Sequence, residues 1–364
     1  MYNELKSYLD SLIAQGVPGL DCLLMKDGEV VFRYMAGVSD TQTQAPIVGN
    51  ERYNVYSCSK MITCVAALQL VEQGKLSLTD KLSDYLPEYA NMMVQTKEGT
   101  RPATSEILIR HLFTMTSGLT YEKKSPSMEQ MRLETEGKCP TRQAIAALAR
   151  EPLSFDPGTK WQYSLSHDVL AMVVEVVAGM PFEAYVKEHI FDPLHMNETT
   201  FDPMAFEDER MVPLYHYIDG KAMLHGRTSY SVHDFGPEFV SGGAGCISTV
   251  EDFAKFLEAL RIGNVILKNE TINWMISDQL SGEEHKTFWW SWYCSYGLGV
   301  QCPLRGRNDI GFGWSGAAGC NPIVHRGDGM TFFFARNVLG MNNDKINAGL
   351  VTCLDHIRSA WKNA

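Results

Sequence analysis

Hydrophobic and polar positions alternate along the chain with two different periods. A spacing of three and four residues, typical of amphipathic helices, recurs between glycine and proline interruptions. The helices it predicts cover residues 3–15, 57–73, 107–115, 142–150, 167–178, 182–190, 250–260, 267–276 and 346–361. Shorter apolar runs predict strands at 21–25, 29–34, 297–301, 318–325 and 331–337. Asp27-Gly28 between the first two runs predicts a hairpin.

The order of these elements indicates two structural units. Strands are expected near both ends of the chain, and most of the helices lie between them. This order favours an α/β domain built from both termini, residues 1–82 and 240–364, with a mainly helical domain inserted at 83–239.

Composition and charge narrow the class of protein. The chain has 364 residues, 45% of them apolar and 21% charged, which is an ordinary globular balance. Its 43 acidic and 32 basic residues give a formal charge of -11. Because this charge repels phosphate groups, we expect no nucleic-acid partner.

The chain carries no pattern of a targeting or membrane segment. Glu4, Lys6 and Asp10 stand where a secretory signal needs apolar residues, and the apolar run 169–180 is short and contains Glu175. The nine cysteines include no CxxC pair, so reduced thiols are expected. We therefore expect a cytoplasmic protein that does not bind membranes.

Ser57-Cys58-Ser59-Lys60 is a candidate nucleophile motif at the start of an expected helix. Residues three apart share a helix face, so the amine of Lys60 can lie beside the hydroxyl of Ser57. A helix N-terminus stabilises developing negative charge, and a serine attacks well only when a neighbouring base takes its proton. The alternative is that Ser57 only caps the helix while Lys60 is solvated.

Two further segments extend this pattern. Residues 155–164 form an expected turn that delivers Tyr163 just before a helix, and a phenol can pass a proton between a serine and a lysine. Residues 311–319 are rich in glycine and other small residues, which allows a backbone to approach a ligand closely. Taken alone, a tyrosine at position 163 more often has a core or capping role.

These motifs occur in the order of a known family. The segments that carry the likeness are 16–19 with 26–28, 55–60, 111–119, 163–165, 191–196, 241–245, 296–299 and 314–316. Together they resemble the serine β-lactamase-like superfamily of class C β-lactamases, penicillin-binding DD-peptidases and family VIII carboxylesterases. The resemblance implies an antiparallel sheet flanked by helices, as in the β-lactamase/transpeptidase fold.

The resemblance also implies roles for particular residues. Ser57 would form the acyl-enzyme, and Lys60 would be its proton acceptor or electrostatic partner. Tyr163 would relay the proton to the leaving group and later activate water. The backbone N–H groups of Ser57 and Ala317 would form the oxyanion hole. No metal or other cofactor is implied, and the ten histidines show no HExxH spacing.

Two departures from the β-lactamase pattern bear on the substrate. The third motif reads Trp314-Ser315-Gly316, so an indole replaces the lysine that recognises a substrate carboxylate. Family VIII esterases carry tryptophan at that position. Leu165 replaces the asparagine that would hold a β-lactam side chain. These four positions are the expected substrate-binding residues, and they favour an apolar acyl or alcohol group over a β-lactam.

Other side chains have both a functional and a structural interpretation. His167 follows Tyr163 by one helical turn, His325 lies in a strand after the third motif, and 289–293 is an aromatic cluster. Each is compatible with lining the site, and each is also compatible with ordinary packing. Cys58 is expected to be a buried small residue.

The sequence thus predicts a metal-free serine hydrolase that forms an acyl-enzyme on small esters or amides, similar to carboxylesterases. A β-lactamase, a D-amino-acid peptidase or an acyltransferase on the same machinery is an alternative, as is a non-enzymatic penicillin-binding sensor. The expected partner is a small-molecule substrate. The pattern leaves the natural substrate and the oligomeric state open.

Overall fold

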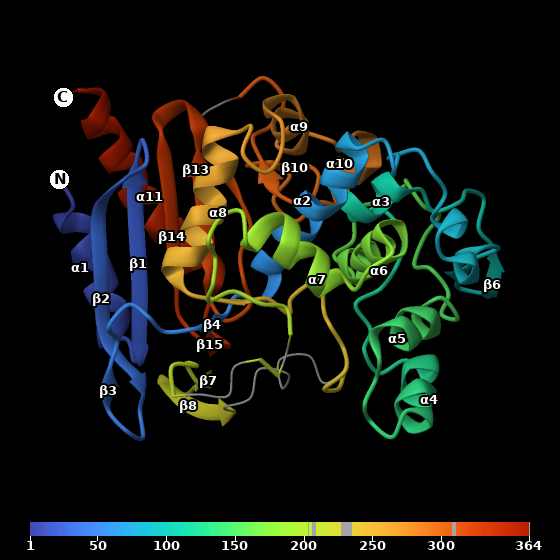
Figure 1. Ribbon diagram of the computed structural model, residues 1–364, viewed down its shortest axis with the longest axis horizontal. Coiled ribbons are helices and arrows are strands. Elements are labelled where there is room, and N and C mark those ends of the chain that lie inside the picture. The colour runs from blue at the N-terminus through green and yellow to red at the C-terminus, as the bar shows by residue number, and fades with distance from the viewer. Residues whose placement is uncertain (203, 206–208, 227–234, 308–310, 364) are drawn as a thin grey trace.

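The computed structural model describes residues 1–364 except 203, 206–208, 227–234, 308–310 and 364. An antiparallel sheet occupies one side of the molecule, and a group of helices occupies the other (Figure 1). The strands of this sheet run in the order β10 (Ser295–Tyr296), β11 (Gln301–Cys302), β12 (Phe312–Gly313), β13 (Asn321–His325), β14 (Met330–Ala335), β1 (Gly19–Lys26), β2 (Glu29–Asp40) and β3 (Ala45–Pro46). β14, near the C-terminus, pairs with β1, near the N-terminus. The sheet is therefore complete only when both ends of the chain meet. The expected fold class is confirmed.

The hairpin between β1 and β2 forms where the sequence predicts it. Asp27 and Gly28 have φ of 50° and 92°, and positive φ at both central residues is typical of a type I′ turn. Next to the turn Lys26 lies opposite Glu29, and a register shift between Leu24 and Met25 then places Cys22 opposite Tyr34.

Helices cover both faces of the sheet. α1 (Asn3–Ala14) and α11 (Asn343–Lys362) lie on the outer face, where Leu20, Leu24 and Phe332 join their core cluster. α8 (Val250–Ile262) lies on the inner face, and Phe333 belongs to that larger core. Because both faces are covered, β14 is buried along its whole length, which explains its continuous hydrophobic run.

The helical part is built around α2 (Ser59–Glu72), which is buried continuously from Ser59 to Leu68. A helix that is apolar on all sides belongs in the interior of a protein. α6 (Ser166–Ala178) and α7 (Phe182–Val186) pack on α2, α3 (Ile109–Phe113) and α5 (Thr141–Leu148) pack on α6, and α4 (Pro126–Glu134) packs on α5. The buried position of α2 fixes the location of the residues that precede it.

Smaller elements connect these layers. They are β4 (Tyr53–Asn54), β5 (Met93–Thr96), β6 (Gly99–Pro102), β7 (Leu214–Ile218), β8 (Lys221–Gly226), β9 (Ile247–Ser248), β15 (Val338–Leu339), α9 (Asn269–Met275), α10 (Gly282–Thr287), a π-helical turn at Lys187–Phe191, and 3-10 turns at Tyr56–Cys58, Leu82–Asp84, Pro87–Tyr89 and Arg326–Asp328. β4 pairs with β9, which ties the segment before α2 to the segment before α8.

Three expected elements differ from the structure. Residues 297–301 were expected to form a strand, but β11 begins only at Gln301, because Gly297 packs against the carbonyl of Met275 and Gly299 has φ of 85°. β13 begins at Asn321 rather than at 318, since residues 316–319 form a tight turn. The helix expected at 107–115 is limited to Ile109–Phe113.

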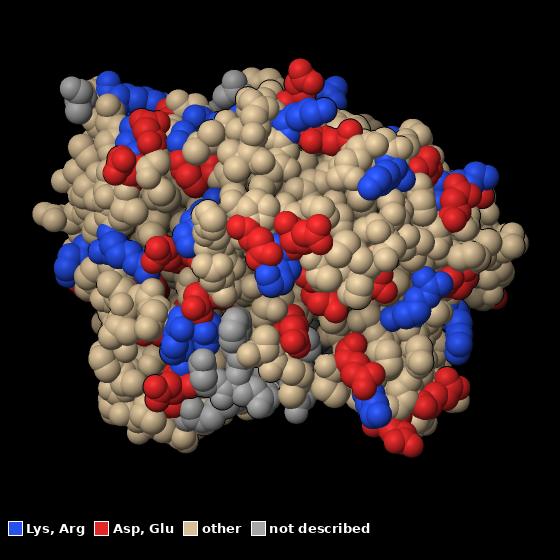
Figure 2. All heavy atoms as spheres, viewed as in Figure 1, with Lys and Arg blue, Asp and Glu red and all other residues tan. Residues whose placement is uncertain are grey.

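Charges are distributed evenly over the surface that can be viewed. Figure 2 shows acidic and basic side chains interspersed on one face of the molecule. Within the described ranges, no single helix is long and apolar enough to cross a membrane. The pair Ser166–Ala178 and Phe182–Phe191, bent by 80°, meets that criterion only when its two parts are joined.

Candidate active site

Ser57 lies in a 3-10 turn that runs directly into α2, rather than in the first turn of the α-helix itself. The preceding residue, Tyr56, has φ of 48°, a left-handed conformation that is uncommon for an aromatic residue and stores strain. The Ser59 hydroxyl donates to the carbonyl of Tyr56 and accepts from the backbone N–H of Cys246 at 3.0 Å. Ser59 therefore holds the turn that presents Ser57.

Lys60 is fully buried, and its amine is directed at Ser57. Nζ donates to Ser57 Oγ at 3.3 Å and to the carbonyl of Gly243 at 2.6 Å. The same nitrogen lies 4.7 Å from the ring centroid of Tyr163 and 5.9 Å from that of Tyr121. One carbonyl, one hydroxyl and two aromatic faces thus surround a cation that water does not reach.

Tyr163 reaches the same point from a different part of the chain. Its hydroxyl donates to Ser57 Oγ at 2.5 Å. Its ring is stacked between Tyr121 and Trp314, at centroid distances of 5.4 and 5.9 Å, and Trp289 lies 5.2 Å away. The structure therefore brings the hydroxyl, amine and phenol that the sequence singled out to one place.

Asp168 is part of this arrangement, although the sequence analysis did not select it. Its Oδ1 accepts from the Ser241 hydroxyl at 2.5 Å and from the Gly243 N–H at 3.1 Å. Gly243 in turn accepts from Lys60, so a chain of contacts joins the carboxyl group to the amine. Burial raises the pKa of Asp168, and the positive charge of Lys60 opposes that rise.

Gly243 has to be glycine in this position. A Cβ on it would lie 2.4 Å from Oδ2 of Asp168, closer than real Cβ contacts. Oδ2 has no hydrogen-bond partner in the part of the chain that the structure describes. The only sequence signal for Asp168 is a carboxylate in the first turn of an otherwise apolar helix, α6.

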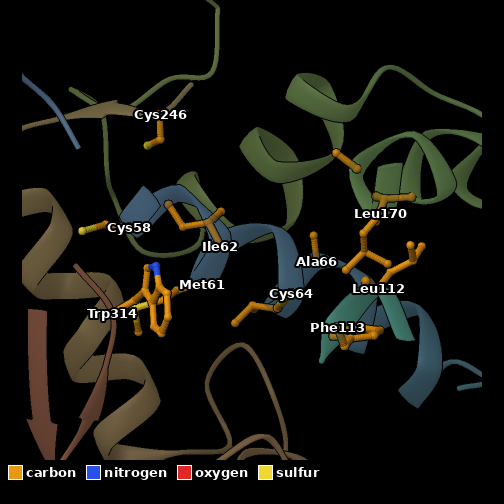
Figure 3. Close-up of a cluster of buried hydrophobic side chains, with 14 of the residues drawn as sticks. Cys58, Met61, Ile62, Cys64, Ala66, Leu112, Phe113, Leu170, Cys246 and Trp314 are labelled. Atoms are coloured by element: carbon orange, nitrogen blue, oxygen red, sulfur yellow. The ribbon is translucent and has the colours of Figure 1, made fainter. Parts of the chain in front are cut away.

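The third motif forms another wall of the site. Trp314 is buried beside Trp290 and Tyr296, and Figure 3 shows its indole next to Met61 at the start of α2. A Cβ on Gly316 would lie 2.4 Å from the carbonyl of Val55, so the turn after Trp314 packs closely on the strand end that leads to Ser57.

Ala317 lies on this turn and is exposed. Its carbonyl accepts from Nδ2 of Asn343 at 2.9 Å, which fixes the turn against the first residue of α11. Ser315 is half-buried beside it. Leu165 does not join this surface: it is 3% exposed and packs in the larger core.

The remaining candidates have structural partners of their own. His167 is fully buried, with Nε2 3.2 Å from the Phe113 carbonyl, and burial together with Lys60 lowers its pKa to about 3. His325 lies against Arg358 on the outer face of the sheet. Cys58 is fully buried, with Sγ 3.7 Å from the Cys320 carbonyl. Within the described ranges, no three His, Cys, Asp or Glu side chains gather as a metal site would require.

Comparison with known proteins agrees with the fold. The chain matches the family described as Beta-lactamase over residues 5–350. Among solved structures, EstCE1, a hydrolase with promiscuous acyltransferase activity, aligns with a TM-score of 0.81 at 22% identity, covering 97% of this chain and 98% of EstCE1.

Two curated relatives are esterases. Esterase EstB of Burkholderia gladioli is 28% identical over 352 residues, which cover 88% of this chain and 86% of EstB. The lovastatin esterase of Penicillium rubens is 32% identical over 242 residues, 62% of this chain and 59% of that esterase. The fold and its relatives define a serine hydrolase. The chain belongs to the beta-lactamase family, which confirms the resemblance seen in the sequence.

Proposed function

We propose that the protein hydrolyses small carboxylic esters through an acyl-enzyme on Ser57. The observation that carries the proposal is that Ser57 Oγ is contacted both by the phenol of Tyr163 at 2.5 Å and by the amine of Lys60 at 3.3 Å. A serine hydroxyl needs a neighbouring base to become a nucleophile, and here two proton-carrying groups contact it in a site shielded from water.

The proposed reaction has two steps. Ser57 Oγ attacks the ester carbonyl and gives its proton to Tyr163, which reacts as the phenolate beside the positively charged amine of Lys60. The backbone N–H groups of Ser57 and Ala317 stabilise the oxyanion, where one such donor contributes roughly 3 kcal/mol in comparable hydrolases. Tyr163 then protonates the departing alcohol. In the second step, Tyr163 activates the water that releases the acid.

Asp168 supports this step as a positioning residue. Through Ser241 and Gly243 it holds the carbonyl that receives the amine of Lys60. The carboxyl group thereby fixes the direction from which Lys60 approaches the hydroxyl.

The walls of the site favour esters over β-lactams. Trp314 offers an aromatic face where a carboxylate-binding lysine would stand, and Leu165 is buried rather than offering an amide. The two esterases among the relatives support the same preference. Acyl transfer to an alcohol is a second candidate, because the same acyl-enzyme reacts with any hydroxyl that replaces water, and EstCE1 carries that activity.

The test combines labelling with turnover. A fluorophosphonate probe should label the wild-type protein and p-nitrophenyl butyrate should be hydrolysed, whereas Ser57→Ala should do neither. Ser7→Ala is the matched control, because it removes an exposed serine hydroxyl on α1 and should keep the label. Labelling that persists in Ser57→Ala would remove the assignment. Nitrocefin hydrolysis as fast as ester hydrolysis would assign a β-lactamase activity to the protein in place of the esterase activity.

A further inference from the structure

A cavity of about 670 Å³ lies between α11 and the outer face of β11, β12 and β13. Ile323 and Val351 line it from the strand and the helix, while Gly311 and Gly313 contribute no side chain to fill it. The aromatic residues 289, 290, 292 and 293 form a further wall. Its size and mainly apolar lining are those of small-molecule sites.

This cavity adjoins the candidate active site and shares two of its walls. Trp289 and Trp314 line it, and both rings also pack on Tyr163, at 5.2 and 5.9 Å between centroids. Ser315 lines it as well. The departing alcohol of an ester has to contact the phenol that protonates it, so a large alcohol that extends from Tyr163 past Trp289 and Trp314 would enter this cavity.

The cavity extends from that point along α11. Asn347 lines it near the N-terminal end of the helix, beside the turn that carries Ala317, and Arg358 lines its far end. Asn347 and Arg358 are eleven positions apart, which corresponds to about 16 Å of helix. Arg358 donates to Asp328 at 2.6 Å and to Asp355 at 2.7 Å, so its charge is compensated and does not select an anionic ligand.

One buried polar group points to the chemistry of the ligand. Asn321 is 5% exposed and lines the cavity, and its Nδ2 has no hydrogen-bond partner within the described ranges. Asn321 lies two residues before Ile323, and Ile323 pairs with Gly313. Because the two strands are antiparallel, Asn321 lies beside Ser315, two residues after Gly313. The amide is therefore at the Ser315 end of the cavity. Buried amide donors almost always have an acceptor, and a ligand oxygen would supply one here.

We propose that the cavity binds the alcohol part of the ester, and that this alcohol is a large, mainly apolar ring system with an oxygen that accepts from Asn321. The inference rests on the proposed function. The ester C–O bond breaks, the acyl group stays on Ser57 Oγ, and the alcohol oxygen takes a proton from Tyr163. The neutral alcohol then leaves through the cavity, whose aromatic walls suit a fused ring.

The first experiment varies the alcohol while the acyl group stays constant. Val351→Phe fills the cavity, and its matched control is Thr352→Phe, which adds the same ring at an exposed position on α11 outside the lining. For 4-methylumbelliferyl acetate, Val351→Phe should lower kcat/KM about tenfold or more, mainly through KM. Methyl acetate should be unaffected, and so should Thr352→Phe with either ester. Equal effects of Val351→Phe on both esters, or none on either, overturn the proposal.

A second variant tests the hydrogen bond. Asn321→Ala should lower kcat/KM for 4-methylumbelliferyl acetate, whose ring carries a lactone carbonyl, by about tenfold. It should leave 2-naphthyl acetate, which lacks that acceptor, unchanged. A loss of the same size with both esters would contradict the role of Asn321. Circular dichroism melting curves establish that both variants are folded.

A third measurement separates this inference from the proposed function. The Ser57→Ala protein, which cannot form an acyl-enzyme, is titrated with 4-methylumbelliferone while tryptophan fluorescence is followed. Saturable quenching that weakens about tenfold when Val351→Phe is added supports the cavity even if no ester is hydrolysed. Ester hydrolysis without any such quenching leaves the proposed function standing and overturns the cavity as the alcohol site.

Discussion

The phenol oxygen of Tyr163 lies 2.5 Å from the hydroxyl oxygen of Ser57, although 106 positions separate the two residues in the chain. The contact depends on two supports from different directions. α2, buried within the helical part, fixes Ser57, and stacking between Tyr121 and Trp314 fixes the ring of Tyr163. A single proton can therefore move between the two oxygens without any rearrangement of the backbone.

Removing this phenol oxygen should abolish most turnover but not the fold. Tyr163→Phe keeps the stacked ring and loses only the proton-carrying group, so kcat for p-nitrophenyl butyrate should fall by roughly 10²–10⁴-fold. The melting temperature should change little. Tyr185→Phe on α7, distant from Ser57, is the control and should keep wild-type kcat. A Tyr163→Phe protein with wild-type kcat would contradict the proton relay.

Replacing the buried carboxyl group of Asp168 should affect stability and activity in opposite directions. Burial raises its pKa in the folded protein above the usual value near 3.8, so the folded state gains less from ionisation than the unfolded state. This carboxyl therefore costs stability as the pH rises from 3.8 through its folded pKa. Asp168→Asn keeps an acceptor for Ser241 and Gly243 and should melt at a higher temperature than wild type at pH 7.

The same variant should lower kcat by about tenfold, which corresponds to 1.4 kcal/mol, because the charge beside Lys60 is lost. Ser241→Ala, which keeps the charge and removes one of its hydrogen bonds, should instead lower the melting temperature. Both variants are compared by differential scanning calorimetry and by ester kinetics between pH 5 and 8. An Asp168→Asn protein with unchanged kcat would show that the carboxyl group is only structural.

Acid should destabilise the protein through buried histidines. Burial, with a further contribution from Arg110, lowers the pKa of His111 to about 4, while an unfolded histidine titrates near 6.5. As the pH falls below 6.5, the unfolded chain takes up protons that the folded protein does not, so the free energy of unfolding decreases until about pH 4. His167 adds to the same trend down to about pH 3.

His111→Asn should reduce this acid sensitivity. An asparagine oxygen can replace Nδ1, which accepts from the Leu108 N–H at 3.1 Å, and it does not titrate. Between pH 7 and pH 5, urea unfolding should show a decrease smaller by about 2 kcal/mol than in wild type. Identical pH dependence of the two proteins would contradict the assignment.

Thiol reagents should leave the folded enzyme active. All nine cysteines are free and buried, and burial raises the pKa of Cys58, Cys64 and Cys246, which disfavours the reactive thiolate. Iodoacetamide at pH 7.5 should therefore modify no cysteine of the native protein, as measured by mass spectrometry, and esterase activity should persist. In urea, all nine should react. Rapid loss of activity with modification of Cys58 would contradict this prediction.

The elements that the sequence predicted correctly are those whose signal is local. α1, α6 and α11 have a continuous helical period, and the hairpin at Asp27 has a turn sequence that few other conformations accept. The strand expected at 297–301 was wrong for the opposite reason. A Cβ on Gly299 would lie 2.2 Å from Sγ of Cys64, so contact with α2 determines the conformation of this segment.

The residues of the candidate site show the same difference between local signals and distant contacts. The order of motifs selected Ser57, Lys60 and Tyr163, because nucleophile and lysine lie one helical turn apart and the tyrosine follows a recognisable turn. The sequence analysis did not select Asp168, because a lone carboxylate in the first turn of an apolar helix is a common feature of helices without a catalytic role. Its role arises only from Ser241 and Gly243, more than 70 positions away.

By itself, the sequence determined most of the helices, though not α4 or α10, together with the residue types that can perform acyl chemistry and the family to which the chain belongs. Tertiary structure alone decided that Asp168 is joined to Lys60 through Gly243, that Leu165 is buried, and that Asn321 lines a cavity beside α11. The physical reason is the range of the interactions. Helix period and turn preference act over a few residues. Desolvation, stacking and shared hydrogen bonds instead depend on distant segments that meet only when the chain folds and strands from its two ends pair in one sheet.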